Sequence, residues 1–470
     1  MRKLIAIGLG LVLLASCQRE EPEPYGAVPS EAQVEWQRME MNMFCHFGPN
    51  TFTGNEWGDG KESEDVFAPS ELDCGQWVDV AKMAGMKGII ITAKHHDGFC
   101  LWPSRQSRHT VRESGWREGK GDVLRELSEA CRMGGVRFGV YVSPWDRNAE
   151  TYGSEEYNQT FVETLKEVLG EYGEVFEQWF DGANGEGPNG RRQEYDWELF
   201  NKTVAELQPR AVIFSDVGPG CRWIGNEEGR AGRRMWSTLN PEGFEPGKGP
   251  GEAVLNEGVE GGERWIGGEA DVSIRKGWFY RDSEHPKSVE ELLRIYYESV
   301  GRNALLLLNV PPDTRGKIAA EDSVRLAEFR EVLDEIFKED LSRGSKVETD
   351  SRWDRRYKAE YVTDTTERCW VAGKGNLTAR ITLKLPERRT FNRIMLQENI
   401  RLGQRVAEFS VEAKDENGEW HKIAEETTIG YKRIVQTEKT TTDEVRINIK
   451  RSLAEPTLSR IALYNDKYLK

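Results

Sequence analysis

The sequence predicts two domains, a (β/α)8-like barrel (TIM barrel) followed by a C-terminal β-sandwich. Residues 35–340 alternate short apolar segments with amphipathic helical segments, which is typical of parallel α/β barrels. Residues 347–470 instead alternate polar and apolar positions with period two, interrupted by turn signals such as 415–418. The 470 residues of the chain provide enough length for both domains.

The barrel strands are predicted from short apolar, β-branched runs. Residues 88–93 are the clearest example, because their lack of polar alternation indicates a strand buried on both faces. The segments between strands place apolar residues at helical spacing, and several end at glycine. The Gly-rich stretch 218–284 is expected to hold irregular loops and degraded barrel elements. The predicted strands are 43–46, 88–93, 138–142, 177–180, 211–214 and 304–308, and the predicted helices are 77–84, 123–133, 161–172, 197–207, 289–300 and 321–338.

A polar segment, 342–346, is expected to link the two domains. The second domain is predicted to contain strands at 381–385, 407–413, 420–424, 445–449 and 461–464. Two roles stay open for this sandwich. It either binds carbohydrate or braces the barrel.

The N-terminus has the pattern of an exported bacterial lipoprotein. Three residues with two positive charges precede an apolar run, 4–14, that is too short to span a bilayer, so residues 1–17 are predicted to be a signal peptide. The sequence Leu14-Ala15-Ser16-Cys17 resembles the lipobox, which implies lipidation of Cys17. Residues 18–34 are expected to form a tether whose acidic part, 18–24, is disordered. The prediction is a protein anchored to the bacterial outer membrane, on its periplasmic or surface face, that touches the membrane only through lipid. A cleaved secretory leader is the alternative.

Charge and cysteine content restrict the function classes. A net charge of -15 without a basic stripe argues against a nucleic-acid partner. The six cysteines after Cys17 show no metal-binding spacing, and most lie in apolar segments, so buried thiols are expected, with one disulfide left open. The 15 Trp, 14 Tyr and 17 Phe residues suit stacking on sugar faces, and equally suit a large core.

Polar and aromatic side chains follow four of the predicted strands. His95 and His96, two of only six histidines, come directly after the strand at 88–93, and His46, Tyr141 and Asp181 lie at the ends of three others. Because the carboxyl ends of parallel strands meet at one rim, we expect a site there. The alternative is that one or both adjacent histidines are only packed.

Two carboxylates are candidates for acid and base chemistry. Asp181 follows an apolar Trp-Phe strand end, and in such a water-poor pocket a carboxylate interacts more strongly with a developing cation. The alternative is that this Asp caps the following helix. The loop 225–229 offers Glu227 and Glu228, or is simply solvated. A separation of about 5 to 5.5 Å would give a retaining glycosidase and about 6.5 to 9.5 Å an inverting one. The sequence leaves that distance open.

Five motifs, which occur in the expected order along the chain, resemble those of the α-L-fucosidases of glycoside hydrolase family 29, and the resemblance covers both domains. The resemblance implies that Asp181 is the nucleophile and that Trp278 is a pocket-wall aromatic. It also implies that fucose is bound by His46, Glu56, Trp57, His95, His96 and Tyr141, with no cofactor and no metal. The motifs are Met43-Phe44-Cys45-His46-Phe47-Gly48, Asn55-Glu56-Trp57-Gly58, Lys94-His95-His96-Asp97-Gly98-Phe99, Trp179-Phe180-Asp181-Gly182 and Leu307-Leu308-Asn309-Val310-Pro311-Pro312.

The segment 222–227 resembles the subgroup that prefers branched α-1,3/1,4-linked fucose, which implies Glu227, rather than its neighbour Glu228, as acid/base. The expected function is a retaining exo-α-L-fucosidase acting on fucosylated oligosaccharides or glycoconjugates of Lewis type. A broad-specificity α-L-fucosidase is the alternative. Fucose needs hydrogen bonders for three hydroxyls, which neutral histidines supply, and an apolar patch for its methyl group. The stretch 243–262 is a candidate loop for the sugar next to fucose.

Two other function classes compete with this interpretation. A metal-dependent hydrolase would use His46, His95, His96 and Asp181 as ligands, but adjacent strand residues point to opposite faces and the H-x-H spacing is absent. A non-catalytic glycan-binding lipoprotein would keep the barrel without chemistry. Such a protein has no need of both Asp181 and Glu227.

Overall fold

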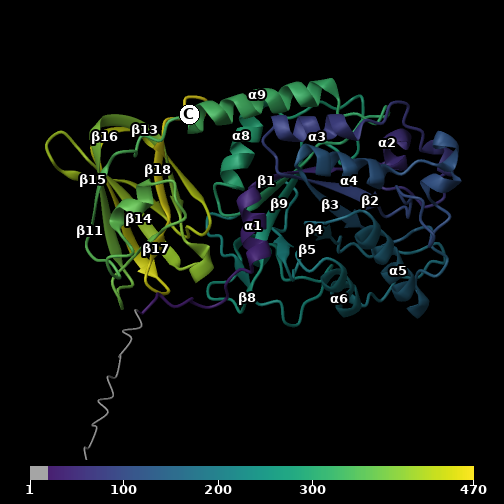
Figure 1. Ribbon diagram of the computed structural model, residues 1–470, viewed down its shortest axis with the longest axis horizontal. Coiled ribbons are helices and arrows are strands. Elements are labelled where there is room, and N and C mark those ends of the chain that lie inside the picture. The colour runs from purple at the N-terminus through teal and green to yellow at the C-terminus, as the bar shows by residue number, and fades with distance from the viewer. Residues whose placement is uncertain (1–19, 470) are drawn as a thin grey trace, which may run out of the picture.

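The computed structural model describes residues 20–469, which form two domains side by side (Figure 1). The larger domain is a strand barrel surrounded by helices, and the smaller one consists mainly of antiparallel strands. The predicted signal peptide and Cys17 lie outside the described residues. Within residues 20–469, no helix combines the length and apolarity that crossing a membrane requires.

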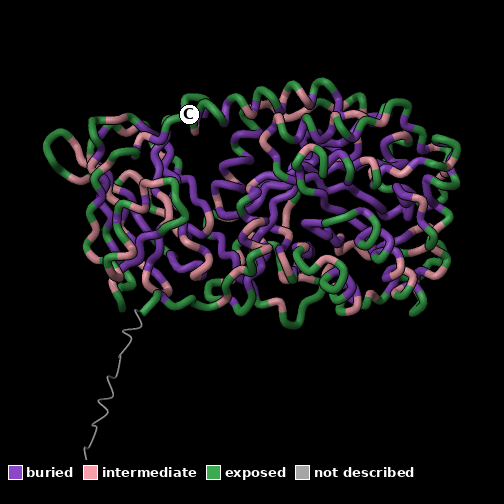
Figure 2. Tube along the Cα trace, in the orientation of Figure 1, coloured by how far each residue is buried: buried purple, intermediate pink, exposed green. Residues whose placement is uncertain are grey.

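Eight parallel strands close the barrel in the order β1-β10-β9-β6-β5-β4-β3-β2, which confirms the predicted barrel. Register is set by pairs such as Met43 opposite Leu308 and Met43 opposite Ile89. The strands are buried and the helices around them show exposed outer faces (Figure 2). The barrel strands are β1 Met41–Cys45, β2 Gly88–Lys94, β3 Arg137–Val142, β4 Glu177–Trp179, β5 Val212–Ser215, β6 Cys221–Trp223, β9 Gly267–Ser273 and β10 Leu305–Asn309.

The surrounding helices form where the sequence combines an amphipathic pattern with end signals. In α4, the Asp122 side chain accepts from Arg125 N at the start, and Gly135 ends the helix with φ 70°. All six predicted helices are confirmed, although α5 begins at residue 155 rather than 161. The helices are α1 Glu31–Met39, α2 Pro49–Thr53, α3 Cys74–Met83, α4 Val123–Gly134, α5 Glu155–Glu171, α6 Trp197–Leu207, α7 Glu252–Glu257, α8 Val289–Glu298 and α9 Ala320–Phe337, with 3-10 turns η1 Glu64–Val66, η2 Val111–Glu113, η3 Trp116–Gly119, η4 Ala359–Thr363 and η5 Ile400–Leu402.

The Gly-rich stretch departs from a regular barrel, as predicted. Only residues 216–220 connect β5 to β6, and they contain no helix. Between β6 and β9 the chain forms the two-residue strands β7 Thr238–Leu239 and β8 Arg264–Trp265 and the short helix α7. The long segment between β6 and β9 therefore supplies the loops near the carboxyl ends of β5 and β6.

Aromatic side chains fill the barrel beneath the rim. Trp36 of α1 enters from the opposite end and donates from Nε1 to Glu177 Oε2 at 2.9 Å. Trp179 stacks on Phe214 with ring centroids 3.9 Å apart. The barrel is thus a packed core whose upper layer can present rigid functional groups.

The disorder predicted for residues 18–24 of the tether is wrong for residues 20–24. Residues from Glu20 onward run along the C-terminal domain to α1 (Figure 1), and Trp353 Nε1 donates to the Glu20 carbonyl at 3.1 Å. Tyr25 N donates to the Leu402 carbonyl at 3.0 Å. Helix α1 already begins at residue 31, because Ser30 forms a capping box there. Acidic composition alone did not reveal these backbone hydrogen bonds.

The C-terminal domain is built on a six-stranded antiparallel sheet with a separate two-stranded ladder. The predicted strands at 381–385 and 445–449 are parts of much longer strands, β13 and β16. Shifts in their pairing register break the period-two pattern, which is why the sequence predicted only fragments. The strands are β11 Lys346–Thr349, β12 Trp370–Val371, β13 Ala379–Gln397, β14 Val406–Lys414, β15 Trp420–Glu426, β16 Arg433–Ser452, β17 Thr457–Leu458 and β18 Arg460–Tyr464.

The predicted linker, 342–346, is a tight turn rather than a free connection. Ser342 is buried, and its hydroxyl lies 2.7 Å from Asp340 Oδ1 and 3.1 Å from the Ile461 carbonyl. Helix α9 spans the junction along one edge of the molecule (Figure 1), where Phe337 meets Tyr464 edge-on at 4.9 Å. The two domains therefore pack directly against each other.

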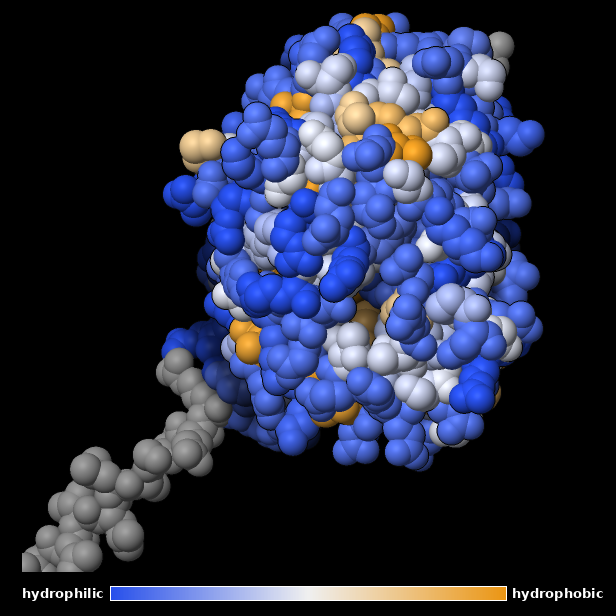
Figure 3. All heavy atoms as spheres, turned by 90° about the vertical axis from the view of Figure 1, so that its right-hand side faces the viewer, coloured by the Kyte–Doolittle hydropathy of each residue, from blue (hydrophilic) through white to orange (hydrophobic). Residues whose placement is uncertain are grey.

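The prediction that the cysteines are buried thiols is confirmed. Six free cysteines are buried in the described chain, and none of them is in a disulfide. The face seen in Figure 3 is predominantly hydrophilic, with hydrophobic residues gathered in small groups.

Candidate active site

The predicted histidines and Tyr141 come together at the carboxyl ends of β1, β2 and β3. Ring centroids are 5.9 Å apart for His46 and His95, 4.2 Å for His95 and His96, and 5.7 Å for His95 and Tyr141. Trp278, from the loop after β9, lies 5.0 Å from His46. Four separate chain segments thus build one aromatic and imidazole cluster.

His46 is held by Asn309 at the end of β10. Its Nδ1 lies 2.9 Å from Asn309 Oδ1, while Asn309 Nδ2 donates to Ser273 Oγ at 2.9 Å and to the Trp278 carbonyl at 2.8 Å. Because the amide nitrogen donates both times, Oδ1 is the acceptor for His46 Nδ1–H. Burial lowers the pKa of His46 to about 3. The ring is therefore neutral, and its Nε2 is left as an acceptor.

The adjacent pair, His95 and His96, is also buried and neutral. Burial lowers the pKa of His95 well below its ordinary value, and the neighbouring His96 lowers it further. Burial likewise lowers the pKa of His96, although the charge of Asp181 opposes this. Within residues 20–469, His95 Nδ1 has no hydrogen-bond partner despite its burial.

Ser143 fixes the tautomer of His96. Its hydroxyl donates to the Trp145 carbonyl at 2.8 Å, so it accepts from His96 Nδ1–H at 2.8 Å. The other ring nitrogen, Nε2, then carries no proton and lies 3.6 Å from Asp181 Oδ2. This places an acceptor nitrogen directly beside the Asp181 carboxylate.

Asp181 follows β4 and has each carboxyl oxygen fixed by a donor. The Tyr141 hydroxyl donates to Oδ2 at 3.1 Å, and the Ala183 amide donates to Oδ1 at 2.8 Å. Burial raises the pKa of Tyr141 well above its ordinary value, so the phenol keeps its proton. The alternative role of Asp181 as a helix cap does not apply, because the next helix, α6, is capped by Asp196.

Glu227 and Glu228 point to different environments. Trp278 Nε1 donates to Glu227 Oε2 at 3.3 Å, whereas the Glu228 carboxylate lies 3.6 Å from the Arg230 guanidinium at the surface. Desolvation raises the pKa of Glu227, and the charges of Asp181 and Glu56 raise it further. A β-bridge between Glu228 and Val272 of β9 anchors this loop to the barrel. Glu227 thus faces the cluster and Glu228 does not.

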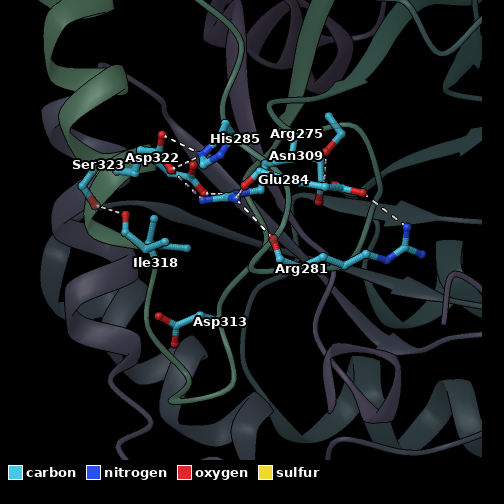
Figure 4. A network of polar contacts seen from close by, with 12 residues as sticks. Arg275, Arg281, Glu284, His285, Asn309, Asp313, Ile318, Asp322 and Ser323 are labelled. Atoms are coloured by element: carbon cyan, nitrogen blue, oxygen red, sulfur yellow. Dashed lines mark hydrogen bonds and ion pairs between the residues drawn. The ribbon is translucent and has the colours of Figure 1, made fainter. Parts of the chain in front are cut away.

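Glu56 contacts a polar network that reaches α9, and Figure 4 shows its members Arg281, Glu284, Arg275 and Asp322. The Glu56 carboxylate accepts from Trp278 N at 2.6 Å and from Arg281 Nη2 at 2.8 Å. Arg281 in turn pairs with Glu284, whose carbonyl accepts from the buried Arg275. Arg275 also donates to Asp322 Oδ2 at 2.9 Å in the first turn of α9. The network fixes the loop that carries Trp278.

Trp57 lies at the rim and is 57% exposed. Its ring meets His96 edge-on at 5.7 Å and Trp145 edge-on at 5.6 Å. An aromatic ring that is open on one side and packed on the other can cover the face of a sugar.

The residues of the metal-hydrolase alternative do not form a cluster of ligands. Among the described residues, two groups of potential metal ligands exist, Glu177 with Cys221 and Glu269, and Asp415 with Glu419 and His421. Neither contains His46, His95, His96 or Asp181. Both histidines of the pair do reach the site, because β2 ends at residue 94 and the strand alternation ends with it.

This arrangement matches known proteins over both domains. The family model described as Alpha-L-fucosidase matches residues 24–335, and the F5/8 type C domain model matches residues 345–463. The chain belongs to the alpha-L-fucosidase family. As a member of this family, the protein is a glycoside hydrolase that acts as an α-L-fucosidase.

Individual relatives cover nearly the whole chain. Alpha-L-fucosidase 1 of Arabidopsis thaliana is 40% identical over 461 residues, which are 97% of this chain and 90% of the relative. The crystal structure of a putative alpha-L-fucosidase from Bacteroides thetaiotaomicron has a TM-score of 0.88 at 37% identity and covers 94% of this chain and 99% of its own. A GH29 fucosidase of Ruminococcus gnavus in complex with fucose has a TM-score of 0.88 at 32% identity, covering 96% and 98%.

Several residues that build this family site were not predicted from the sequence. Asn309 orients His46, although its motif had been noted, and Ser143 sets the tautomer of His96. Phe279 packs edge-on against His46 at 5.4 Å and His95 at 5.1 Å. Asn309 is the last residue of β10 and Ser143 directly follows β3, whereas Phe279 neighbours the predicted Trp278. A position at a strand end, or beside a predicted site residue, was therefore the available signal.

Proposed function

We propose that this protein is a retaining exo-α-L-fucosidase in which Asp181 is the nucleophile and Glu227 the acid/base. The observation that carries the proposal is the pair of carboxyl groups on either side of the aromatic cluster. Asp181 has both oxygens fixed by donors, whereas the pKa of Glu227 is raised by desolvation, so that it retains a proton more readily. Two carboxyl groups in such different environments suit a nucleophile and a general acid.

The first step forms a covalent intermediate. An Asp181 oxygen attacks the anomeric carbon of fucose while the bond to the glycosidic oxygen breaks, and Glu227 gives its proton to that leaving oxygen. In the second step, water gives a proton to Glu227 and its oxygen bonds to the anomeric carbon. The bond to Asp181 breaks as this new bond forms, so Asp181 returns to a carboxylate and fucose leaves with its configuration retained.

The cluster of neutral histidines supports recognition of fucose. His46 and His96 offer bare Nε2 acceptors. Trp278 and Phe279 supply apolar surface for a 6-methyl group. A related Ruminococcus gnavus fucosidase was crystallised with fucose, which supports a fucosyl group in the corresponding place.

We propose branched α-1,3/1,4-linked fucose, as in Lewis-type glycans, as the substrate. The resemblance of residues 222–227 to the subgroup with this preference supports it, as does the loop 243–251, which packs next to Gly182 beside the proposed nucleophile. Contacts with the second sugar would then stabilise the transition state of the reaction. Broad specificity remains the competing proposal.

The test is a comparison of three substrates. We expect kcat/KM for a Lewis trisaccharide to exceed that for 4-nitrophenyl fucoside and for an α-1,2-linked fucoside by at least about tenfold, or about 1.4 kcal/mol. Proton NMR should show the retained anomer as the first product. Similar or faster turnover of the aryl fucoside would favour broad specificity, and no turnover of any fucoside would favour a glycan-binding protein.

We also propose that Cys17 carries a lipid that anchors the protein to a bacterial outer membrane. The support is the sequence alone, with its lipobox-like residues 14–17. Labelled fatty acid should be incorporated by the wild type and not by Cys17→Ser. A membrane-associated, unlabelled wild type would contradict the proposal.

A further inference from the structure

One loop touches both sides of the proposed catalytic pair. The loop between β7 and β8 packs against Gly182, directly after Asp181, and continues into α7, which packs against the segment that carries Glu227. We infer that residues 246–257 are a brace that sets the separation of Asp181 and Glu227, with Asp216 as its anchor on the barrel. The inference rests on the catalytic roles proposed for the two carboxyl groups.

The contact with the nucleophile strand is made by two glycines. A Cβ added to Gly182 would lie 2.5 Å from Gly247 N, and a Cβ added to Gly247 would lie 2.1 Å from the Gly182 carbonyl oxygen. No side chain fits at either place, so the two backbones touch. Gly247 also has φ +80°, a conformation that L side chains rarely adopt. The position of this loop is therefore coupled directly to that of Asp181.

Asp216 holds the loop at the carboxyl end of β5. Gly247 N lies 3.0 Å from both Asp216 carboxyl oxygens, and Asp216 also accepts a hydrogen bond from the Gly249 amide. A Cβ on Gly249 would lie 3.0 Å from Asp216 Oδ2, which shows how closely the backbone wraps the carboxylate. Because β5 lies between β4 and β6, its end is a suitable anchor between the two catalytic segments.

Helix α7 makes the contact with the acid/base segment. Asn256 Nδ2 donates to the Ile224 carbonyl at 3.1 Å and to the Arg230 carbonyl at 2.9 Å, so it bridges both ends of the loop that carries Glu227. A Cβ on Gly225 would lie 3.1 Å from the Glu252 backbone oxygen. Arg222 of β6, which is buried, donates to the Leu255 carbonyl at 2.8 Å.

The brace is separate from most residues that are proposed to bind fucose. His46 and His95 follow β1 and β2, which lie four and three places away from β5 in the strand order of the barrel. Displacing the brace should therefore change the spacing of the two carboxyl groups more than the affinity for fucose. That separation decides whether a glycosidase can form a covalent intermediate.

The experiment compares two glycines with similar backbone conformations. Gly247→Ala places a methyl group against Gly182, whereas Gly190→Ala, in the loop after β4, is the matched control, because Gly190 has a similar φ of +72° but nothing within 4 Å of its added Cβ. We expect Gly247→Ala to lower kcat at least about tenfold on both 4-nitrophenyl fucoside and a Lewis trisaccharide. The inhibition constant of fucose should stay within about threefold, and Gly190→Ala should resemble the wild type in both.

Asp216 provides the second measurement. We expect Asp216→Ala to lower kcat in the same way and Asp216→Asn, which keeps one acceptor oxygen, to recover part of it. Near-wild-type kcat in both Gly247→Ala and Asp216→Ala, or equal losses in Gly247→Ala and Gly190→Ala, would overturn the inference. So would a loss confined to KM for the trisaccharide, since the loop would then serve only the second sugar. If the wild type cleaves no fucoside, the proposed function fails instead.

Discussion

The Tyr141 hydroxyl donates to Asp181 Oδ2 at 3.1 Å, from a phenol ring stacked between His95 and Trp179. Removing only the hydroxyl in Tyr141→Phe should lower kcat/KM on 4-nitrophenyl fucoside about tenfold to hundredfold, because a hydrogen bond to a charged group contributes about 1.5 to 3 kcal/mol. The ring remains, so thermal stability should change little. Unchanged kinetics within twofold would show that the contact does not position Asp181.

Glu227→Ala should slow natural glycans far more than aryl fucosides, because a phenolate leaving group needs little protonation. Glu228→Ala is the matched control, since Glu228 faces Arg230 at the surface. Rates on both substrate types give the comparison. If Glu228→Ala discriminates between them and Glu227→Ala does not, the acid/base assignment is wrong by one residue.

The pKa of Glu227 should control the basic side of the pH profile. The acid must be protonated, so kcat/KM falls as the pH rises through that raised pKa. The hydrogen bond from Trp278 stabilises the carboxylate and lowers this pKa, so Trp278→Phe should move the basic limb to higher pH. A limb that stays in place, or moves to lower pH, would contradict this role of Trp278.

The core of the barrel holds a carboxyl group with a raised pKa. Burial raises the pKa of Glu177 to about 7. Because the folded protein then binds its proton more tightly, Glu177 weakens the fold as the pH rises from its ordinary pKa of about 4.5 to about 7. Glu177→Gln should therefore raise the free energy of unfolding at pH 8 by about 1 to 3 kcal/mol relative to the wild type. In urea titrations this gain should shrink below pH 5, and a gain independent of pH would contradict it.

Much of the barrel was predictable from the sequence because buried parallel strands are short apolar runs. The strand at 88–93 was predicted to within one residue, and the histidines after it were placed correctly at the rim. Strand β6 was missed, since its three residues include the buried Arg222, whose guanidinium is satisfied by carbonyls such as that of Leu255. A buried charged side chain whose partners are backbone carbonyls leaves no apolar pattern in the sequence that could be detected.

The supporting residues of the site were harder to predict than the reactive ones. Asp181 and His46 lie just after the ends of β4 and β1, so their position follows from the fold. The contact of Gly182 with Gly247 joins residues 65 positions apart through backbone packing, which no local pattern records. The ordered segment from Glu20 was missed for the same reason, because its partners lie in the second domain.

Trapping the proposed covalent intermediate tests the central claim most directly. A 2-deoxy-2-fluoro-fucosyl donor with a good leaving group should label the protein once, and peptide mass spectrometry should locate the label on Asp181. Asp181→Ala should take up no label while keeping its fold. A label on another carboxylate, or an inverted first product from an enzyme that is never labelled, would contradict Asp181 as the nucleophile of a retaining fucosidase.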